Sequence, residues 1–157
     1  MSERTFPELA GDNGHCPDTS GLSPEELLPH RDTMLLVEKI LAVGETGAVT
    51  RSRVVPSWPL AGEDGVSPLV LVELAAQTAG VYNSWKKIRR QGRDCDKNGW
   101  LVAVKKAAFH TGTLPFGMDV TTRSHNTMET DNLVEVTSRL CCGDTPLAEV
   151  ILQIYQP

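Results

Sequence analysis

The sequence lacks the marks of secreted, membrane-spanning and nucleic-acid-binding proteins. The N-terminal stretch 1–18 has no apolar segment of the kind found in signal peptides. No uninterrupted apolar run approaches the roughly 20 residues that cross a bilayer. The net charge is −5, and no basic segment is interleaved with aromatic residues. We therefore expect a cytoplasmic protein whose partners include neither nucleic acid nor a membrane.

A cysteine pattern typical of metal sites is also missing. The four cysteines are Cys16, Cys95, Cys141 and Cys142, and their spacing fits no zinc motif. Neighbouring residues on a strand point to opposite faces, so Cys141 and Cys142 are poorly placed to share one ligand. The sequence predicts reduced thiols and no metal site.

The 157 residues, 40% hydrophobic and 22% charged, suffice for one globular domain. Segment 1–22 is rich in Gly, Pro, Asp and Ser without a hydrophobic period, which predicts a flexible leader. The domain over 23–157 opens with a short helix that Ser23 caps and Pro29 limits. Strands are expected over 34–43, 48–55, 100–109, 119–128, 133–142 and 145–155.

One long helix, expected over 67–92, interrupts this series of strands. Ser67 is the expected cap, Pro68 the first helical residue, and Gly92 the end. The first half of the helix is apolar on nearly every side, which indicates that other structure encloses it. The element order predicts an α+β fold in which a curved antiparallel sheet wraps this central helix. Because one sheet covers only part of a helix, we also expect a dimer.

Glu73 and Gln77 interrupt the apolar half of the helix. Burying a carboxylate is costly unless it is paired or hydrogen-bonded, so Glu73 is the leading candidate for acid/base chemistry. Gln77 lies one turn later on the same face, where it can orient Glu73 or a water. The alternative is a structural carboxylate, hydrogen-bonded across a dimer interface.

Two stretches resemble 3-hydroxyacyl-acyl-carrier-protein dehydratases of the hotdog fold. The sequence LPHRDTMLLVE at 28–38 is similar to their LPHRxPxLLVD segment, and LVELAAQTAG at 71–80 to the LxxEAxAQxxG stretch of their central helix. The continuation VYNSW at 81–85 resembles the predicted dehydratases of aryl-polyene-type gene clusters. Over residues 22–156 the resemblance implies a hotdog fold with no cofactor, because phosphopantetheine carries the substrate. It also implies an acyl carrier protein or a CoA thioester as partner.

The loop before the helix departs from this pattern. The related dehydratases carry a catalytic His in a GHFPG loop, and an ungapped alignment from Glu73 puts Pro59 there, with Trp58 beside it. No histidine occurs between His30 and His110. His30 is therefore the best substitute for the missing group by its chemistry, although its LPHR context is not the family's catalytic position.

The start of the helix also departs from the pattern of these dehydratases. Pro68 stands where the family has a Gly whose N–H binds the thioester carbonyl, and proline has no N–H. A shift of one residue restores a donor at Leu69, and the first helical N–H groups are free to bind a carbonyl. We expect the substrate to contact Gln77, Trp58, Pro59, Leu69 and Val70.

The resulting expectation is a dehydratase-like protein that acts on 3-hydroxyacyl thioesters in fatty-acid or polyene-type biosynthesis, with Glu73 and His30 as its catalytic residues. Two alternatives remain open. One is a hotdog acyl thioesterase that uses Glu73 as base or nucleophile. The other is a non-catalytic hotdog subunit that pairs with an active dehydratase. The sequence leaves open whether the assembly is a homodimer or a heterodimer.

Overall fold

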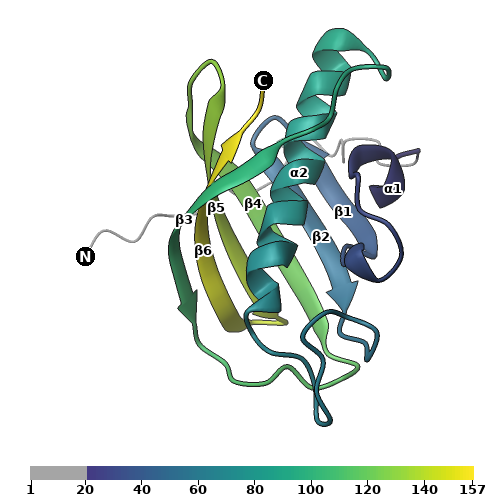
Figure 1. Cartoon of the computed structure of the whole chain (residues 1–157), viewed down its shortest axis with the longest axis vertical. Coiled ribbons are helices and arrows are strands. Elements are labelled where there is room, and N and C mark those ends of the chain that lie inside the picture. Colours follow the sequence, from purple (N-terminus) through teal and green to yellow (C-terminus); the bar gives the residue numbers. More distant parts are fainter. Residues whose placement is uncertain (1–20) are drawn as a thin grey trace.

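The computed structural model describes residues 21–157, so the expected leader at 1–22 lies almost wholly outside the described residues. Within them, one long helix lies across a curved antiparallel sheet (Figure 1). The elements are α1 (Pro24–Leu27), the 3-10 turn η1 (Asp32–Met34), β1 (Lys39–Gly44), β2 (Gly47–Arg53), α2 (Val70–Gln91), β3 (Trp100–Phe109), β4 (Asp119–Glu129), β5 (Leu133–Cys142) and β6 (Thr145–Tyr155).

The sheet has six strands in the order β1-β2-β4-β5-β6-β3, and every neighbouring pair is antiparallel. The hairpin from β1 to β2 closes where Gly44 pairs with Gly47, at the turn that the sequence predicts. The chain then leaves β2, passes through α2, and returns as β3 at the opposite edge, beside β6. This is the predicted hotdog architecture of one sheet and one central helix.

One side of α2 packs on the sheet, and the opposite side is partly open. Leu71, Leu74 and Ala75 are fully buried, and the hydroxyl oxygens of Thr78 and Thr50 on β2 lie 2.8 Å apart. Ala76, on the outer side, is only half-buried. The expectation that the helix is enclosed all round is therefore met on the sheet side alone, because a single layer of strands reaches only one side of a helix.

The start of α2 lies later than the sequence predicts. The helix begins at Val70, because Ser67, Pro68 and Leu69 form a tighter turn. In this turn the Val70 amide donates to the Ser67 carbonyl at 3.1 Å, and the Leu71 amide to that of Pro68 at 3.0 Å. The C-terminal end agrees with the prediction: Gly92 adopts a φ of 88°, which glycine tolerates.

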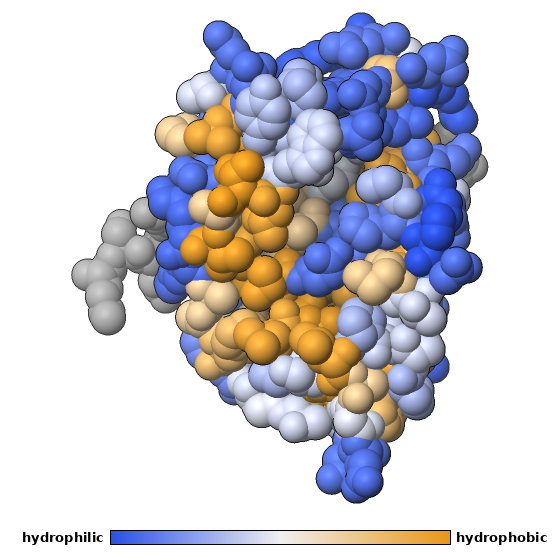
Figure 2. Space-filling view, in the orientation of Figure 1, coloured by the Kyte–Doolittle hydropathy of each residue, from blue (hydrophilic) through white to orange (hydrophobic). Residues whose placement is uncertain are grey.

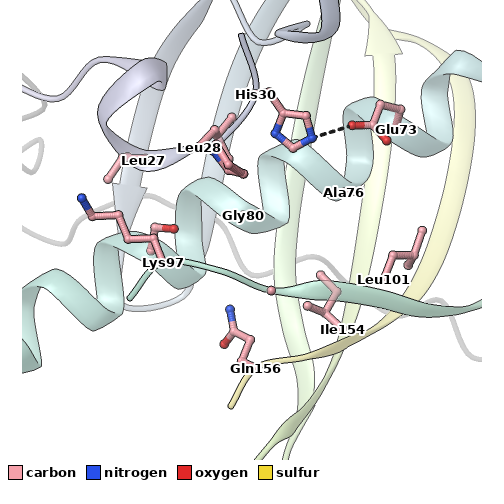
Figure 3. A pocket seen from close by; sticks show the side chains of 13 residues that line it. Leu27, Leu28, His30, Glu73, Ala76, Gly80, Lys97, Leu101, Ile154 and Gln156 are labelled. Carbon is pink, nitrogen blue, oxygen red and sulfur yellow. Dashed lines mark ion pairs between the residues drawn. The ribbon is translucent and has the colours of Figure 1, made fainter. Parts of the chain in front are cut away.

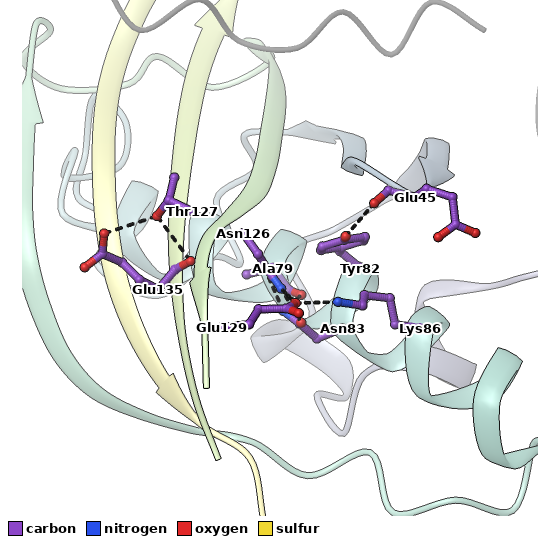
Figure 4. Close-up of polar contacts among 9 residues, drawn as sticks. All are labelled: Glu45, Ala79, Tyr82, Asn83, Lys86, Asn126, Thr127, Glu129 and Glu135. Carbon is purple, nitrogen blue, oxygen red and sulfur yellow. Dashed lines mark hydrogen bonds and ion pairs between the residues drawn. The ribbon is translucent and has the colours of Figure 1, made fainter. Parts of the chain in front are cut away.

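Polar contacts fix the C-terminal half of α2 to the neighbouring strands (Figure 4). The Tyr82 hydroxyl donates to the Glu45 carbonyl in the β1–β2 turn at 2.8 Å, and burial raises the pKa of this phenol. On the other flank, Asn126 of β4 donates to the Asn83 side chain at 2.9 Å. The path of the helix is therefore set at both flanks.

Strand β3 is exposed along most of its length. Trp100, Leu101, Val102 and Val104 are each between 45% and 54% exposed. Figure 2 shows a broad hydrophobic area on the face where β3 and α2 lie. A long apolar edge strand is a template for pairing with another chain. None of the described helices has the length and apolar character needed to cross a membrane.

The loop before α2 is held by short backbone contacts. Val66 and Leu114 exchange hydrogen bonds of 2.9 and 2.8 Å, and the Ser67 amide donates to the Leu60 carbonyl at 3.1 Å. A Cβ on Gly65 would lie 2.2 Å from the Leu114 carbonyl oxygen, much closer than any real contact. Only glycine fits this position.

We expect Gly65→Ala to lower the free energy of unfolding by about 2 kcal/mol or more, because the backbone must move to admit the methyl group. Urea unfolding measures the loss. Gly112→Ala is the matched control, since a Cβ there meets nothing within 4 Å. Equal midpoints for the two variants would contradict the packing of this loop.

Candidate active site

Gln77 joins the central helix to the segment that resembles LPHRxPxLLVD. Its side chain is fully buried, and its amide oxygen accepts hydrogen bonds from the Leu36 and Val37 amides at 2.9 and 3.3 Å. Its amide nitrogen donates to the Met34 carbonyl at 2.7 Å and to Glu73 Oε1 at 2.9 Å. The two motifs that carry the family resemblance are therefore in direct contact.

His30 and Glu73 meet at the surface of this junction. His30 Nε2 lies 3.1 Å from Glu73 Oε1, and the two side chains are 30% and 35% exposed. Arg31 stabilises the turn that carries His30, because its guanidinium donates to the carbonyls of Leu28 and His30 at 2.7 and 2.6 Å. Glu73 is thus less buried than the apolar character of its helix predicts, because it lies on the outer side of α2.

A groove of about 150 Å³ runs along the outer side of α2, with the His30–Glu73 pair at one end and Lys97 and Gln156 near the other (Figure 3). The small residues Ala76 and Gly80 line the groove between its ends, and Gly80 leaves room for Leu28 close to the helix. The other lining residues are Leu27, Leu28, Pro29, Ser84, Gly99, Leu101 and Ile154.

Only part of the predicted site comes together. His30 and Glu73 line the groove, and the buried Gln77 side chain donates a hydrogen bond to Glu73 from inside the protein. Trp58 belongs to the hydrophobic core, with 6% of its surface exposed, and does not line the groove. Its position next to Pro59 in the sequence gives no indication of the side of the loop on which the ring packs.

The helix start offers fewer free donors than the sequence suggests. The amide of Val70 is bound to the Ser67 carbonyl, and the Val70 side chain is buried. The Leu69 amide makes only a long contact of 3.4 Å with Ser67 Oγ, and Leu69 is 58% exposed. Leu69 lies one helical turn before Glu73, on the same face. It is the freest backbone donor near the carboxylate, although neither Leu69 nor Pro59 lines the groove.

Lys97, Ser84 and Gln156 line the part of the groove farther from Glu73. These three residues are absent from the sequence-based prediction. Ser84 follows Glu73, Ala76 and Gly80 at helical spacing, a signal that was available in the sequence. Lys97 lies in a polar loop and Gln156 lies near the C-terminus. In neither segment does a periodic pattern indicate the direction of a side chain.

The sequence model of the ApeP-like family, described as ApeP dehydratase, matches residues 22–157. The chain belongs to this family. No protein of curated function shows significant sequence similarity to it. The match spans the whole described domain, including both motifs that meet at Gln77 and the loop that lacks the histidine of related dehydratases.

Solved structures show the same fold. One chain of the dehydratase heterocomplex ApeI:P from Xenorhabdus doucetiae has a TM-score of 0.78 and 20% identity, over 87% of this chain and 91% of that chain. A hypothetical thioesterase with coenzyme A from Streptococcus pneumoniae has a TM-score of 0.57 and 11% identity, over 74% and 83%. A putative esterase from Mycobacterium tuberculosis has a TM-score of 0.58 and 12% identity, over 76% and 90%.

We expect Gln77→Met to lower the free energy of unfolding by about 3 kcal/mol, because methionine fills the space but leaves buried backbone groups of Met34 and Leu36 without partners. Urea unfolding at equilibrium measures the change. The control is Gln91→Met at the exposed end of α2. A Gln77→Met variant as stable as this control would show that Gln77 does not hold the junction.

Proposed function

We propose that this chain is a dehydratase subunit that acts on 3-hydroxyacyl thioesters, with Glu73 as the group that moves the proton. The observation that carries the proposal is the His30–Glu73 pair, 3.1 Å apart at one end of a groove. Membership in the ApeP-like dehydratase family supports the reaction class. The pair offers acid/base chemistry in a chain whose loop lacks the histidine of the 3-hydroxyacyl-acyl-carrier-protein dehydratases.

Glu73 has one oxygen that is engaged and one that is free. Oε1 contacts His30 and accepts from Gln77, whereas no residue of the described part of the chain binds Oε2. In the proposed reaction Oε2 accepts the C2 proton, and the electron pair of the C–H bond forms an enolate. The C3–O bond then breaks, and the departing hydroxyl takes the same proton from Glu73 and leaves as water. The products are a 2,3-unsaturated thioester, one water and the original carboxylate.

His30 acts in this scheme as a positioning residue. Its Nδ1 is buried and has no partner within the described residues. A hydrogen on Nε2 is directed at Glu73 Oε1, 3.1 Å away. Together with Gln77, His30 fixes the carboxylate, so that Oε2 faces the substrate.

The enolate needs a hydrogen-bond donor at the thioester oxygen. The Leu69 amide is the available backbone donor one turn before Glu73. The proposed site thus has a proton carrier in Glu73, its two orienting groups in His30 and Gln77, and a donor at the start of α2.

We expect Glu73→Gln to reduce dehydration about a thousandfold, because the amide has no basic oxygen to accept the proton. We expect His30→Gln to retain roughly a tenth of the rate, since its side-chain N–H can still reach Glu73, and His30→Leu to retain far less. Mass spectrometry of a 3-hydroxyacyl carrier protein follows the loss of water.

Circular dichroism confirms that each variant is folded. An unchanged rate in Glu73→Gln would remove Glu73 from the mechanism. A His30→Gln variant as inactive as Glu73→Gln would show that His30 itself transfers a proton. No water loss with the wild-type chain, either alone or paired with a second hotdog chain, would leave it a non-catalytic subunit and reject the dehydratase proposal.

Thioester hydrolysis is the second candidate. A free carboxylate oxygen can activate water or attack a carbonyl, and the fold is shared with a hypothetical thioesterase and a putative esterase. The same mass spectra separate the two reactions, because hydrolysis releases a free 3-hydroxy acid and leaves the carrier unloaded. Release of that acid without water loss would favour the thioesterase.

We also propose that a second hotdog chain pairs with β3. The exposed edge carries apolar side chains, and Leu101 is part of both this edge and the groove. A partner on β3 would therefore cover the open flank of the groove as well as the edge. The structurally similar ApeI:P protein is a heterocomplex, which supports pairing between unlike chains; a second copy of this chain is the alternative.

We expect Val102→Lys to abolish pairing through β3, because it puts a charge into the apolar edge without disturbing the core. Leu41→Lys on β1, the opposite edge of the sheet, is the control. Light scattering during size-exclusion chromatography gives the mass of each variant, alone and co-expressed with a hotdog dehydratase chain. A wild-type chain that is monomeric in both cases would contradict the proposal.

A further inference from the structure

We infer that Lys97 binds the phosphate of a pantetheine-linked thioester and marks the end at which the carrier's arm enters the groove. This inference rests on the proposed function, since it assigns the path by which a thioester reaches Glu73. The shared chemistry is a phosphate on pantetheine, which both CoA and a loaded acyl carrier protein present.

The groove has the length for such an arm. Glu73 lies at one end and Ser84 near the other, eleven residues apart on α2, which corresponds to about 16 Å of helix. An extended phosphopantetheine arm spans a distance of this order. Figure 3 shows His30 and Glu73 at one end, with Lys97 and Gln156 toward the other. A phosphate at Lys97 therefore leaves the thioester within reach of Glu73.

The groove has both apolar and polar lining residues. Ala76, Leu101 and Ile154 are apolar, as is Leu27, which lies near Lys97 (Figure 3). The polar groups include the Ser84 hydroxyl and the Gln156 amide. The amides of pantetheine need hydrogen-bond partners when they leave water, and these polar groups are positioned to provide them.

The charges along α2 favour entry at the Lys97 end. The loop that precedes the helix carries Glu63 and Asp64 and has no Lys or Arg between 54 and 69. The far end of the helix and the loop that follows it carry the cations Lys86, Lys87, Arg89, Arg90, Arg93 and Lys97, which outnumber the two acids of that loop, Asp94 and Asp96. An anionic carrier is attracted to this end and repelled from the other.

Most of these cations already have partners in the chain. Lys86 pairs with Glu129 and Arg89 with Glu45, Arg93 Nη1 lies 3.5 Å from Glu26, and Lys87 donates to the Asp96 carbonyl at 3.1 Å.

Lys97 lines the groove, and within residues 21–157 its side chain makes no hydrogen bond or ion pair. Its charge is felt at Glu26, whose pKa is lowered by the Ser23 amide and, to a smaller degree, by the charges of Arg93 and Lys97. Lys97 is half-buried, so part of its hydration is already lost before a phosphate arrives. Of the cations at this end, it is the one that lies in the groove and remains available.

Calorimetric titration of the full chain with phosphopantetheine and with pantetheine tests the inference without any turnover. We expect phosphopantetheine to bind about fivefold more tightly than pantetheine, the gain of one partly exposed charge pair. Lys97→Gln is expected to remove this preference. Lys39→Gln, the same change at an exposed position of β1 outside the groove, is expected to keep it. Ala76→Leu, which fills the groove, is expected to weaken both ligands.

Three results would overturn the inference: no preference for the phosphate in the wild-type chain, a preference that survives Lys97→Gln, or unchanged binding in Ala76→Leu. Titrations with CoA and with holo acyl carrier protein identify which of the two supplies the arm. If both bind equally well to the wild-type chain and to Lys97→Gln, the inference is also overturned. Because water loss is not measured here, the inference can fail while dehydration by Glu73 stands, and the reverse also holds.

Discussion

The site depends on one buried amide. Gln77 is held inside the protein, where it satisfies backbone groups of the segment that follows His30 and at the same time donates to Glu73. The carboxylate and the imidazole come from elements more than 40 residues apart in the sequence, and this junction brings them within 3.1 Å of each other. Because a buried amide without partners is costly, the chain cannot release Met34 and Leu36 from Gln77 without loss of stability. Stability and chemistry are coupled here through the same side chain.

Much of the fold can be predicted from the sequence. The order of strands around one long helix, the turn between β1 and β2, and the end of α2 at Gly92 follow from periodicity and from the placement of glycine. The start of α2 differs from the prediction, because Ser67 and Pro68 suit both a helix cap and the tighter turn that the structure contains. Local preferences cannot choose between these two forms.

The site was harder to predict, for reasons that differ between residues. Glu73 and Gln77 stand out because polar groups in an apolar helix need a reason to be there. His30 was the chemical substitute for the missing histidine, but its contact with Glu73 is tertiary and leaves no trace in residue spacing. Trp58 was expected near the substrate and belongs to the core, and Lys97 carried no signal at all, since only the folded chain brings its loop to the groove.

The proposed scheme also indicates how a chain without the loop histidine of the 3-hydroxyacyl-acyl-carrier-protein dehydratases could carry out acid/base chemistry. In the proposed scheme, a single carboxylate takes and returns the proton, so the role left for a histidine is to orient that carboxylate. His30 is suited to this role because its Nε2 faces Glu73, while its Nδ1 is buried and has no partner among residues 21–157. In the proposed assembly, a second chain on β3 covers the open flank of the groove but supplies no acid/base group.

The central claim is that one chain holds the complete proton-transfer site. The most direct test co-expresses a Glu73→Gln chain with a His30→Leu chain and assays the purified mixture of the two. Mass spectrometry then compares the rate of water loss from a 3-hydroxyacyl thioester with that of the wild-type chain prepared in the same way. The account predicts that the mixture is as impaired as its two parents, because each site lacks one of its own residues. Recovery of a substantial fraction of the wild-type rate would show that His30 and Glu73 act across two chains, and would contradict it.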